Sequence, residues 1–199
     1  AFAFLDLSKV QKVFVVGGYQ AEVLKNHLSS YKEQVEFVYN PDYQQGSVLT
    51  LEKALPFIKG NFLLMNVDHI YPQKMFFTLL KKVTEKGIFA MADSDRNLVA
   101  DDMKIDFKKP SIIGKISKQL TQYSAGYIGM SFIGKEKLAL YKKAVQVVKE
   151  QTCGKANVEG VLDYLAPQED ISVIDLSGFG WHEVDTPEDK TLAEKTFEA

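Results

Sequence analysis

The chain has 199 residues, of which 46% are hydrophobic and 25% charged, and this is typical of one globular domain with a substantial core. Its 24 basic and 26 acidic side chains are mixed along the sequence without a basic block, which argues against a nucleic-acid partner. Arg96 is the only arginine, so lysine, backbone N–H groups or a metal ion would have to hold any phosphate group.

A single cysteine, Cys153, excludes an internal disulfide framework and a cysteine-rich zinc site, as expected in a reducing compartment. No apolar run approaches the roughly 18 residues that span a bilayer. The first residues, AFAFLDLSKV, lack the basic region and cleavage site of a signal peptide. We therefore expect a cytoplasmic protein without membrane insertion.

In the first half of the chain, β-rich apolar runs alternate with amphipathic stretches. The run FLLMNVD is almost continuously apolar, as in a parallel strand that is covered on both faces. Pro72 then opens a helix that we expect to end near Glu85. The pattern predicts strands at residues 12–18, 35–40, 62–68 and 87–93, with helices starting at about Gln20 and Ser47.

Residues 94–109 are polar and predict a surface excursion, after which regular patterns resume. Alternating strands and helices imply a largely parallel sheet with helices on both sides, mixed at one edge, and ligands in such sheets lie outside the carboxyl ends of the strands. The later elements are predicted as strands at 114–120, 127–134, 171–176 and 178–184 and helices at 135–150, 157–166 and from Thr186 to the end.

Candidate cation ligands follow two of these strands. Asp68 ends the most hydrophobic run and would face the ligand crevice, although an aspartate that caps the next turn is an equally good interpretation. Thr186 explains the start of the last helix, whereas Glu183 and Asp185 alternate on one strand face without a capping function. Carboxylates on one face repel each other unless a cation shields them. Oxygen ligation by Asp68, Asp185 and Glu183 suits Mg²⁺.

The sequence allows two alternative metal sites. His69 and His182 each adjoin a candidate carboxylate, but neighbouring residues of a strand point to opposite faces, which makes a histidine–carboxylate site the weaker interpretation. Residues 93–95, Asp-Ser-Asp, have the Asp-x-Asp pattern of metal-dependent glycosyltransferases, in a polar loop where such triplets arise readily by chance.

The segments VDHIYP, GKISKQL and WHEVDTPEDKTLAE, in this order, resemble the nucleoside-triphosphate transferases that activate sugar phosphates, phosphocholine and inositol phosphate. The Asp-His pair most resembles the inositol-1-phosphate cytidylyltransferases, and the resemblance extends from about Lys12 to the end. It implies a three-layer α/β/α Rossmann-like nucleotidyltransferase fold with a mostly parallel mixed sheet. It also implies transfer of a nucleoside monophosphate, with CMP from CTP favoured, to a small phosphate monoester such as inositol 1-phosphate, phosphocholine or a sugar 1-phosphate, releasing pyrophosphate.

Carried over to this sequence, the resemblance makes Asp68 and Asp185 the magnesium ligands, with Glu183 as an additional or outer ligand. Lys118, in ISKQL, matches the family lysine that contacts the acceptor phosphate. A solvated lysine on an exposed strand is the alternative interpretation of that position.

The segment QQGSVLTLEKAL resembles the part of the family fold that holds the nucleotide, which would place Gln45, Gly46 and Ser47 near the base or ribose. An ordinary N-cap at Ser47 is the equal alternative.

The family's glycine-rich loop with an arginine and a following Pro-Lys pair does not occur in this sequence, and Gly17 and Gly18 predict only a turn. We therefore expect residues 1–199 to form a single nucleotidyltransferase domain without that loop. A nucleotide-sugar-dependent glycosyltransferase of related fold and a catalytically degenerate regulatory member are the alternatives. The sequence gives no indication of the oligomeric state.

Overall fold

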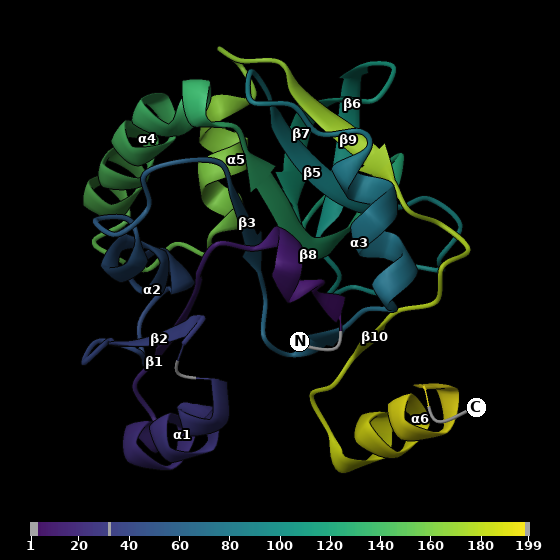
Figure 1. The fold of residues 1–199 in the computed structure, drawn as a ribbon. Coiled ribbons are helices and arrows are strands. Elements are labelled where there is room, and N and C mark those ends of the chain that lie inside the picture. Colours follow the sequence, from purple (N-terminus) through teal and green to yellow (C-terminus); the bar gives the residue numbers. More distant parts are fainter. Residues whose placement is uncertain (1–3, 32, 198–199) are drawn as a thin grey trace.

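A computed structural model describes residues 4–31 and 33–197 (Figure 1). Its centre is a six-stranded sheet in the order β3-β8-β5-β9-β7-β6. Strands β3, β5, β9 and β6 run in one direction, while β8 and β7 run in the other, so most strands point the same way, as predicted. Most neighbours are nevertheless antiparallel, because β8 returns between β3 and β5. The bounds are β3 (Phe62–Met65), β5 (Ile88–Asp93), β6 (Lys104–Lys109), β7 (Ile112–Ser117), β8 (Ala125–Ile133) and β9 (Ile171–Asp175).

Alternate residues of the central strands face two helix layers. In β5, Ile88 and Ala90 belong to the core under α2, α4 and α5, whereas Phe89 and Met91 belong to the core under α3. This period of two is the strand pattern for a sheet that is covered on both faces. Figure 1 shows α4 and α5 on one side of the sheet and α3 on the other, which confirms the predicted three layers. The helices are α2 (Ser47–Ala54), α3 (Gln73–Leu80), α4 (Leu138–Gln151) and α5 (Glu159–Leu165).

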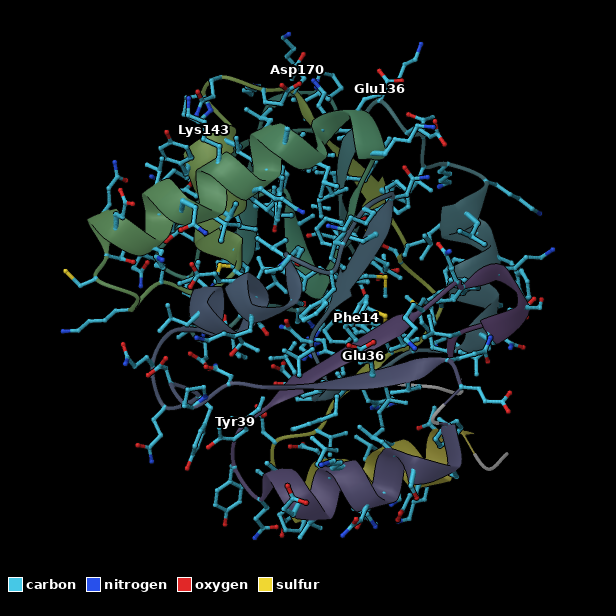
Figure 2. All side chains as sticks on the ribbon, turned by 60° about the vertical axis from the view of Figure 1, so that its left-hand side comes forward. Phe14, Glu36, Tyr39, Glu136, Lys143 and Asp170 are labelled. Carbon is cyan, nitrogen blue, oxygen red and sulfur yellow. The ribbon has the colours of Figure 1, made fainter. Side chains whose placement is uncertain are left out.

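A second, smaller sheet holds the first two strands. β1 (Val13–Gly17) and β2 (Val35–Tyr39) pair in parallel, and α1 (Ala21–Leu28) connects them. Figure 2 shows Phe14 and Glu36 beside each other on these strands, in agreement with their register. Within the described residues β1 pairs only with β2, and β1 and β3 both line one cavity of about 1790 Å³. The cavity therefore separates the two sheets. Short 3₁₀ turns lie at η2 (Leu7–Lys9), η3 (Ser29–Tyr31) and η4 (Lys135–Lys137).

A short antiparallel ribbon lies outside both sheets. It joins β4 (His69–Ile70) to β10 (His182–Glu183), and the last helix, α6 (Pro187–Phe197), follows β10. Thr186 and Asp189 exchange hydrogen bonds at the start of α6, where the Thr186 hydroxyl accepts from the Asp189 N–H and the Asp189 carboxylate accepts from the Thr186 N–H. The predicted cap at Thr186 is confirmed. In the described part of the chain, each helix is too short or too polar to cross a bilayer.

The expectation that residues 94–109 form only an irregular excursion is wrong, because they end in β6. Ile105 is buried and Phe107 partly buried, while Asp106 and Lys108 alternate with them. Charged residues on the outer positions hide this alternation in the sequence. Lys104 is also buried, and its Nζ lies 2.8 to 3.2 Å from the carbonyl oxygens of Val99, Ala100, Asp102 and Lys118, which share its three N–H groups.

We expect Lys104→Met to lower the free energy of unfolding by about 2 kcal/mol, because the carbonyl groups lose charge-assisted hydrogen bonds. Lys109→Met is the matched control, since Lys109 is an exposed residue of the same strand with a 3.4 Å ion pair to Asp170. Its loss should stay below about 1 kcal/mol. Urea unfolding measures both, and equal losses would contradict a structural role for the Lys104 ammonium.

Candidate active site

Three potential metal ligands meet where the ribbon borders the cavity. Asp68, His69 and Glu183 each offer one ligand atom, and these atoms lie within 4.8 Å of one another. The ribbon register sets Glu183 opposite His69, and the Val184 N–H donates to the Asp68 carbonyl at 2.8 Å. All three side chains line the cavity. Pairing of two very short strands thus brings residues together that are far apart in the sequence.

The expectation that Asp68 and His69 point to opposite faces is wrong. Strand β3 ends at Met65, and Asp68 lies in the turn before β4, where strand alternation does not apply. His69 Nδ1 lies 2.6 Å from Asp68 Oδ1. This hydrogen bond holds the pKa of Asp68 below its usual value. His69 therefore orients and stabilises the Asp68 carboxylate.

Glu183 and Asp185 add negative charge beside Asp68. Burial raises the pKa of Glu183, and repulsion from the charges of Asp185 and Asp68 raises it further. Asp185 itself is not part of the group of ligand atoms that meet within 4.8 Å. The structure thus brings two of the three predicted magnesium ligands, Asp68 and Glu183, together, with Asp185 close enough to act on Glu183 electrostatically.

The donor set fits Mg²⁺. Two carboxylates that repel each other favour a divalent cation, and Mg²⁺ is held by one or two carboxylates together with waters and substrate phosphates. The Nδ1 atom of His69 is hydrogen-bonded to Asp68, and ligating carboxylates are commonly held by such hydrogen bonds. Asp68 and Glu183 are therefore the residues that would hold the ion.

Aromatic packing fixes the ring of His69, which is 4% exposed. The ring lies nearly parallel to that of Trp181, at 3°, with 5.3 Å between centroids. Trp181 in turn donates from Nε1 to Asp93 at 2.9 Å, and the guanidinium of Arg96 lies 4.3 Å from the centre of its ring. Such a stack leaves the imidazole little freedom to rotate.

The Asp-Ser-Asp triplet takes part in this support. Asp93 accepts hydrogen bonds from Trp181 and from the N–H of Asp95, and Ser94 donates to Asp175. Residues 93–95 are not among those that line the cavity. The triplet therefore has a structural function at the ends of β5 and β9.

Gly129, which the sequence did not single out, permits the close approach of His69 to β8. Its φ is +70°, and a Cβ atom there would lie 2.9 Å from His69 Nε2 and 3.0 Å from Asn66 Nδ2. The pairing of β5 with β8 shifts register around it. A glycine inside an apolar strand pattern is the sequence signal for such a bulge.

Lys118 and a buried glutamate complete the polar wall of the cavity. Lys118 follows β7, and its ammonium lies 2.7 Å from Asp101 Oδ1. Glu159, the first residue of α5, is only 7% exposed, and burial raises its pKa. All three line the cavity. Glu159 was not predicted, although an acidic residue at the start of an apolar helix was a visible signal.

The predicted nucleotide segment packs against another loop. Gly46, not Ser47, is the N-cap of α2, so the N-cap interpretation of Ser47 is wrong. The Ser47 hydroxyl instead accepts from the N–H of Val158 at 3.0 Å, and a Cβ atom on Gly46 would lie 2.2 Å from the carbonyl oxygen of Ala156. Ser47 lines the cavity, while Gln45 and Gly46 are not among the lining residues.

Known proteins resemble this chain in sequence. It is 25% identical over 189 residues to the bifunctional IPC transferase and DIPP synthase of Rubrobacter xylanophilus, covering 92% of this chain and 41% of the relative. For the protein of the same name from Thermococcus kodakarensis the identity is 23% over 186 residues, covering 93% and 40%. The chain thus spans about two fifths of the length of these curated relatives. No protein-family model matches it.

Solved structures of nucleotidyltransferases also resemble this chain. The inositol-1-phosphate CTP transferase from T. maritima superposes with a TM-score of 0.74 at 19% identity, covering 94% of this chain and 74% of that one. This chain has the nucleotidyltransferase fold. The CTP:phosphocholine cytidylyltransferase from Streptococcus pneumoniae superposes with a TM-score of 0.73 at 17% identity, covering 98% and 82%. The resemblance and the fold class predicted from the sequence are confirmed.

In this nucleotidyltransferase fold, we expect Gly129→Ala to cost more stability than Gly178→Ala. Both glycines have positive φ, at +70° and +74°, so both variants strain the backbone by about 1 to 2 kcal/mol. A Cβ atom at Gly178 meets nothing within 4 Å, whereas at Gly129 it meets His69. Thermal unfolding should separate the two variants by at least about 1 kcal/mol. Equal losses would show that the contact with His69 is unimportant.

Proposed function

We propose that this domain transfers CMP from CTP to a small phosphate monoester, such as inositol 1-phosphate, phosphocholine or a sugar 1-phosphate, and releases pyrophosphate. The observation that carries the proposal is the meeting of Asp68 and Glu183 at a cavity that Lys118 also lines. The two related solved proteins are named as CTP-dependent transferases to inositol 1-phosphate and to phosphocholine, which supports CTP as the donor. A cytoplasmic location is part of the proposal and rests on the lone Cys153.

The chemistry requires little acid–base catalysis. A phosphate monoester carries roughly −1.5 to −2 charge at neutral pH, so its oxygen can attack the α-phosphorus directly. A bond forms between that oxygen and the α-phosphorus, the bond from the α-phosphorus to the bridging oxygen breaks, and pyrophosphate leaves with the electron pair. This agrees with a site in which the one histidine of the cluster orients a carboxylate.

The residues of the chain would position the reactants. Asp68 and Glu183 would hold Mg²⁺, with Asp185 as a further acidic group, and the ion would neutralise phosphate charge during the transfer. Lys118 would hold the acceptor phosphate as a point charge. Glu159 offers a carboxyl group from the same cavity wall to the hydroxyl groups of an acceptor.

The two alternatives have weaker support. A glycosyltransferase would use residues 93–95 as metal ligands, but Asp93 is engaged by Trp181, and the triplet does not line the cavity. A degenerate regulatory member would keep the fold and bind nucleotide weakly or not at all. Its melting temperature would not respond to magnesium.

Thermal shift of the full-length protein with each of the four nucleoside triphosphates, with and without magnesium, tests the proposal. A ligand that binds only the folded state adds about 2.7 kcal/mol to the free energy of unfolding when its concentration is a hundredfold above its Kd. The melting temperature rises as a result. We expect stabilisation by CTP that depends on magnesium. A flat response to all four would favour the degenerate member, and turnover of a nucleotide sugar without pyrophosphate release would favour the glycosyltransferase.

We further expect Asp68→Asn to abolish, and Asp185→Asn to lower, magnesium-dependent pyrophosphate release from CTP and inositol 1-phosphate. The reason is the loss of negative charge at the proposed cation site. Asp106→Asn, at an exposed position of β6 outside the cavity lining, makes the same change as a control. Circular-dichroism melting should show all three variants folded. Full activity of either Asp68→Asn or Asp185→Asn would remove that residue from the site.

A further inference from the structure

The lysine that we assign to the acceptor phosphate already has an anionic partner. Lys118 Nζ lies 2.7 Å from Asp101 Oδ1, and both residues line the cavity. The hydrogen bond from Lys118 lowers the pKa of Asp101, so this carboxyl group is ionised at neutral pH. An incoming phosphate must therefore compete with a carboxylate that belongs to the chain itself.

The buried ammonium group of Lys104 holds the backbone on both sides of the Asp101–Lys118 pair. Lys104 Nζ lies within hydrogen-bonding distance of the carbonyls of Val99, Ala100 and Asp102, on either side of Asp101, and of the carbonyl of Lys118 itself, and shares its three N–H groups among them. The N–H of Val99 also donates to the Asp102 carboxylate at 2.6 Å, which closes the turn. The backbones of the turn and of residue 118 are thus tied to one buried ammonium. The approach of Asp101 to Lys118 follows from this anchoring.

The ion pair between Asp101 and Lys118 is also weak. The side chain of Asp101 is 89% exposed and that of Lys118 is 36% exposed, and exposed ion pairs are weak because water screens them. A phosphate monoester carries up to twice the charge of a carboxylate, so it attracts Lys118 more strongly than Asp101 does. Once displaced, the Asp101 carboxylate still repels the phosphate that replaced it.

We infer that Asp101 is an affinity-setting residue, an internal carboxylate that holds Lys118 at the cavity when the acceptor is absent and weakens the binding of the acceptor phosphate. The inference depends on the role of Lys118 in the proposed function. Its consequence is a site that releases phosphorylated ligands more readily than Lys118 alone would allow.

Binding of inorganic phosphate to the full-length protein, without nucleotide, tests this inference. The titration is followed by calorimetry at low ionic strength and about pH 8, where phosphate is mainly a dianion. We expect Asp101→Asn to tighten phosphate binding about threefold to tenfold, through loss of the competing ion pair and of the repulsion. Asp106→Asn, the same change on the exposed face of β6, should leave the affinity unchanged.

A double-mutant cycle separates this mechanism from a general charge effect. In a Lys118→Gln background, the gain from Asp101→Asn should shrink to the part that comes from repulsion between Asp101 and phosphate, because the ion pair is already lost. Equal affinities of Asp101→Asn and Asp106→Asn, weaker binding by Asp101→Asn, a gain that is undiminished without Lys118, or no phosphate binding by any variant would overturn the inference. Because the titration contains no CTP, its outcome is independent of the CTP thermal shift that tests the proposed transfer.

Discussion

The pairing of β4 with β10 is the constraint on which the site depends. It sets Glu183 opposite His69 and joins the Val184 N–H to the Asp68 carbonyl, so it places two acidic side chains at one point of the cavity wall. A ribbon of two residues on each strand is not stable by itself. The surrounding structure must therefore stabilise the ribbon. The repulsion between its neighbouring carboxylates must also be offset, either by other interactions of the fold or by a bound cation.

Packing around His69 supplies that support. The ring is held between β8, where Gly129 leaves space for it, and Trp181, which comes just before β10 and is tied to Asp93 at the end of β5. Stacking thus connects the two strands of the ribbon to each other and to the central sheet. Gly129 and Trp181, through their contacts with His69, consequently help to determine where the Asp68 carboxylate points.

Most elements could be predicted from the sequence, because apolar periodicity marks the strands that the helices cover. β6 was missed because charged residues at its exposed positions hide the apolar alternation, and because its buried Lys104 is held by backbone carbonyls that no local pattern reveals. At the site, Asp68 and Glu183 were found as acidic residues at strand ends. The contact between Asp68 and His69 was not predicted, because it depends on β3 ending at Met65, three residues before the predicted end of the strand. Ser47 was misassigned because its partner, Val158, lies in a distant loop.

The charge balance of the cavity wall limits the chemistry that it can support. The lining includes the acidic residues Asp68, Asp101, Glu159 and Glu183 together with Lys118, and three further lysines, Lys9, Lys12 and Lys59, line the cavity as well. A triphosphate and a phosphate monoester are both strongly anionic, so the carboxylates of this wall oppose their binding. A divalent cation that binds with the nucleotide would offset this opposition in the proposed transfer, and the carboxylates that oppose phosphate binding are the groups that would attract that cation.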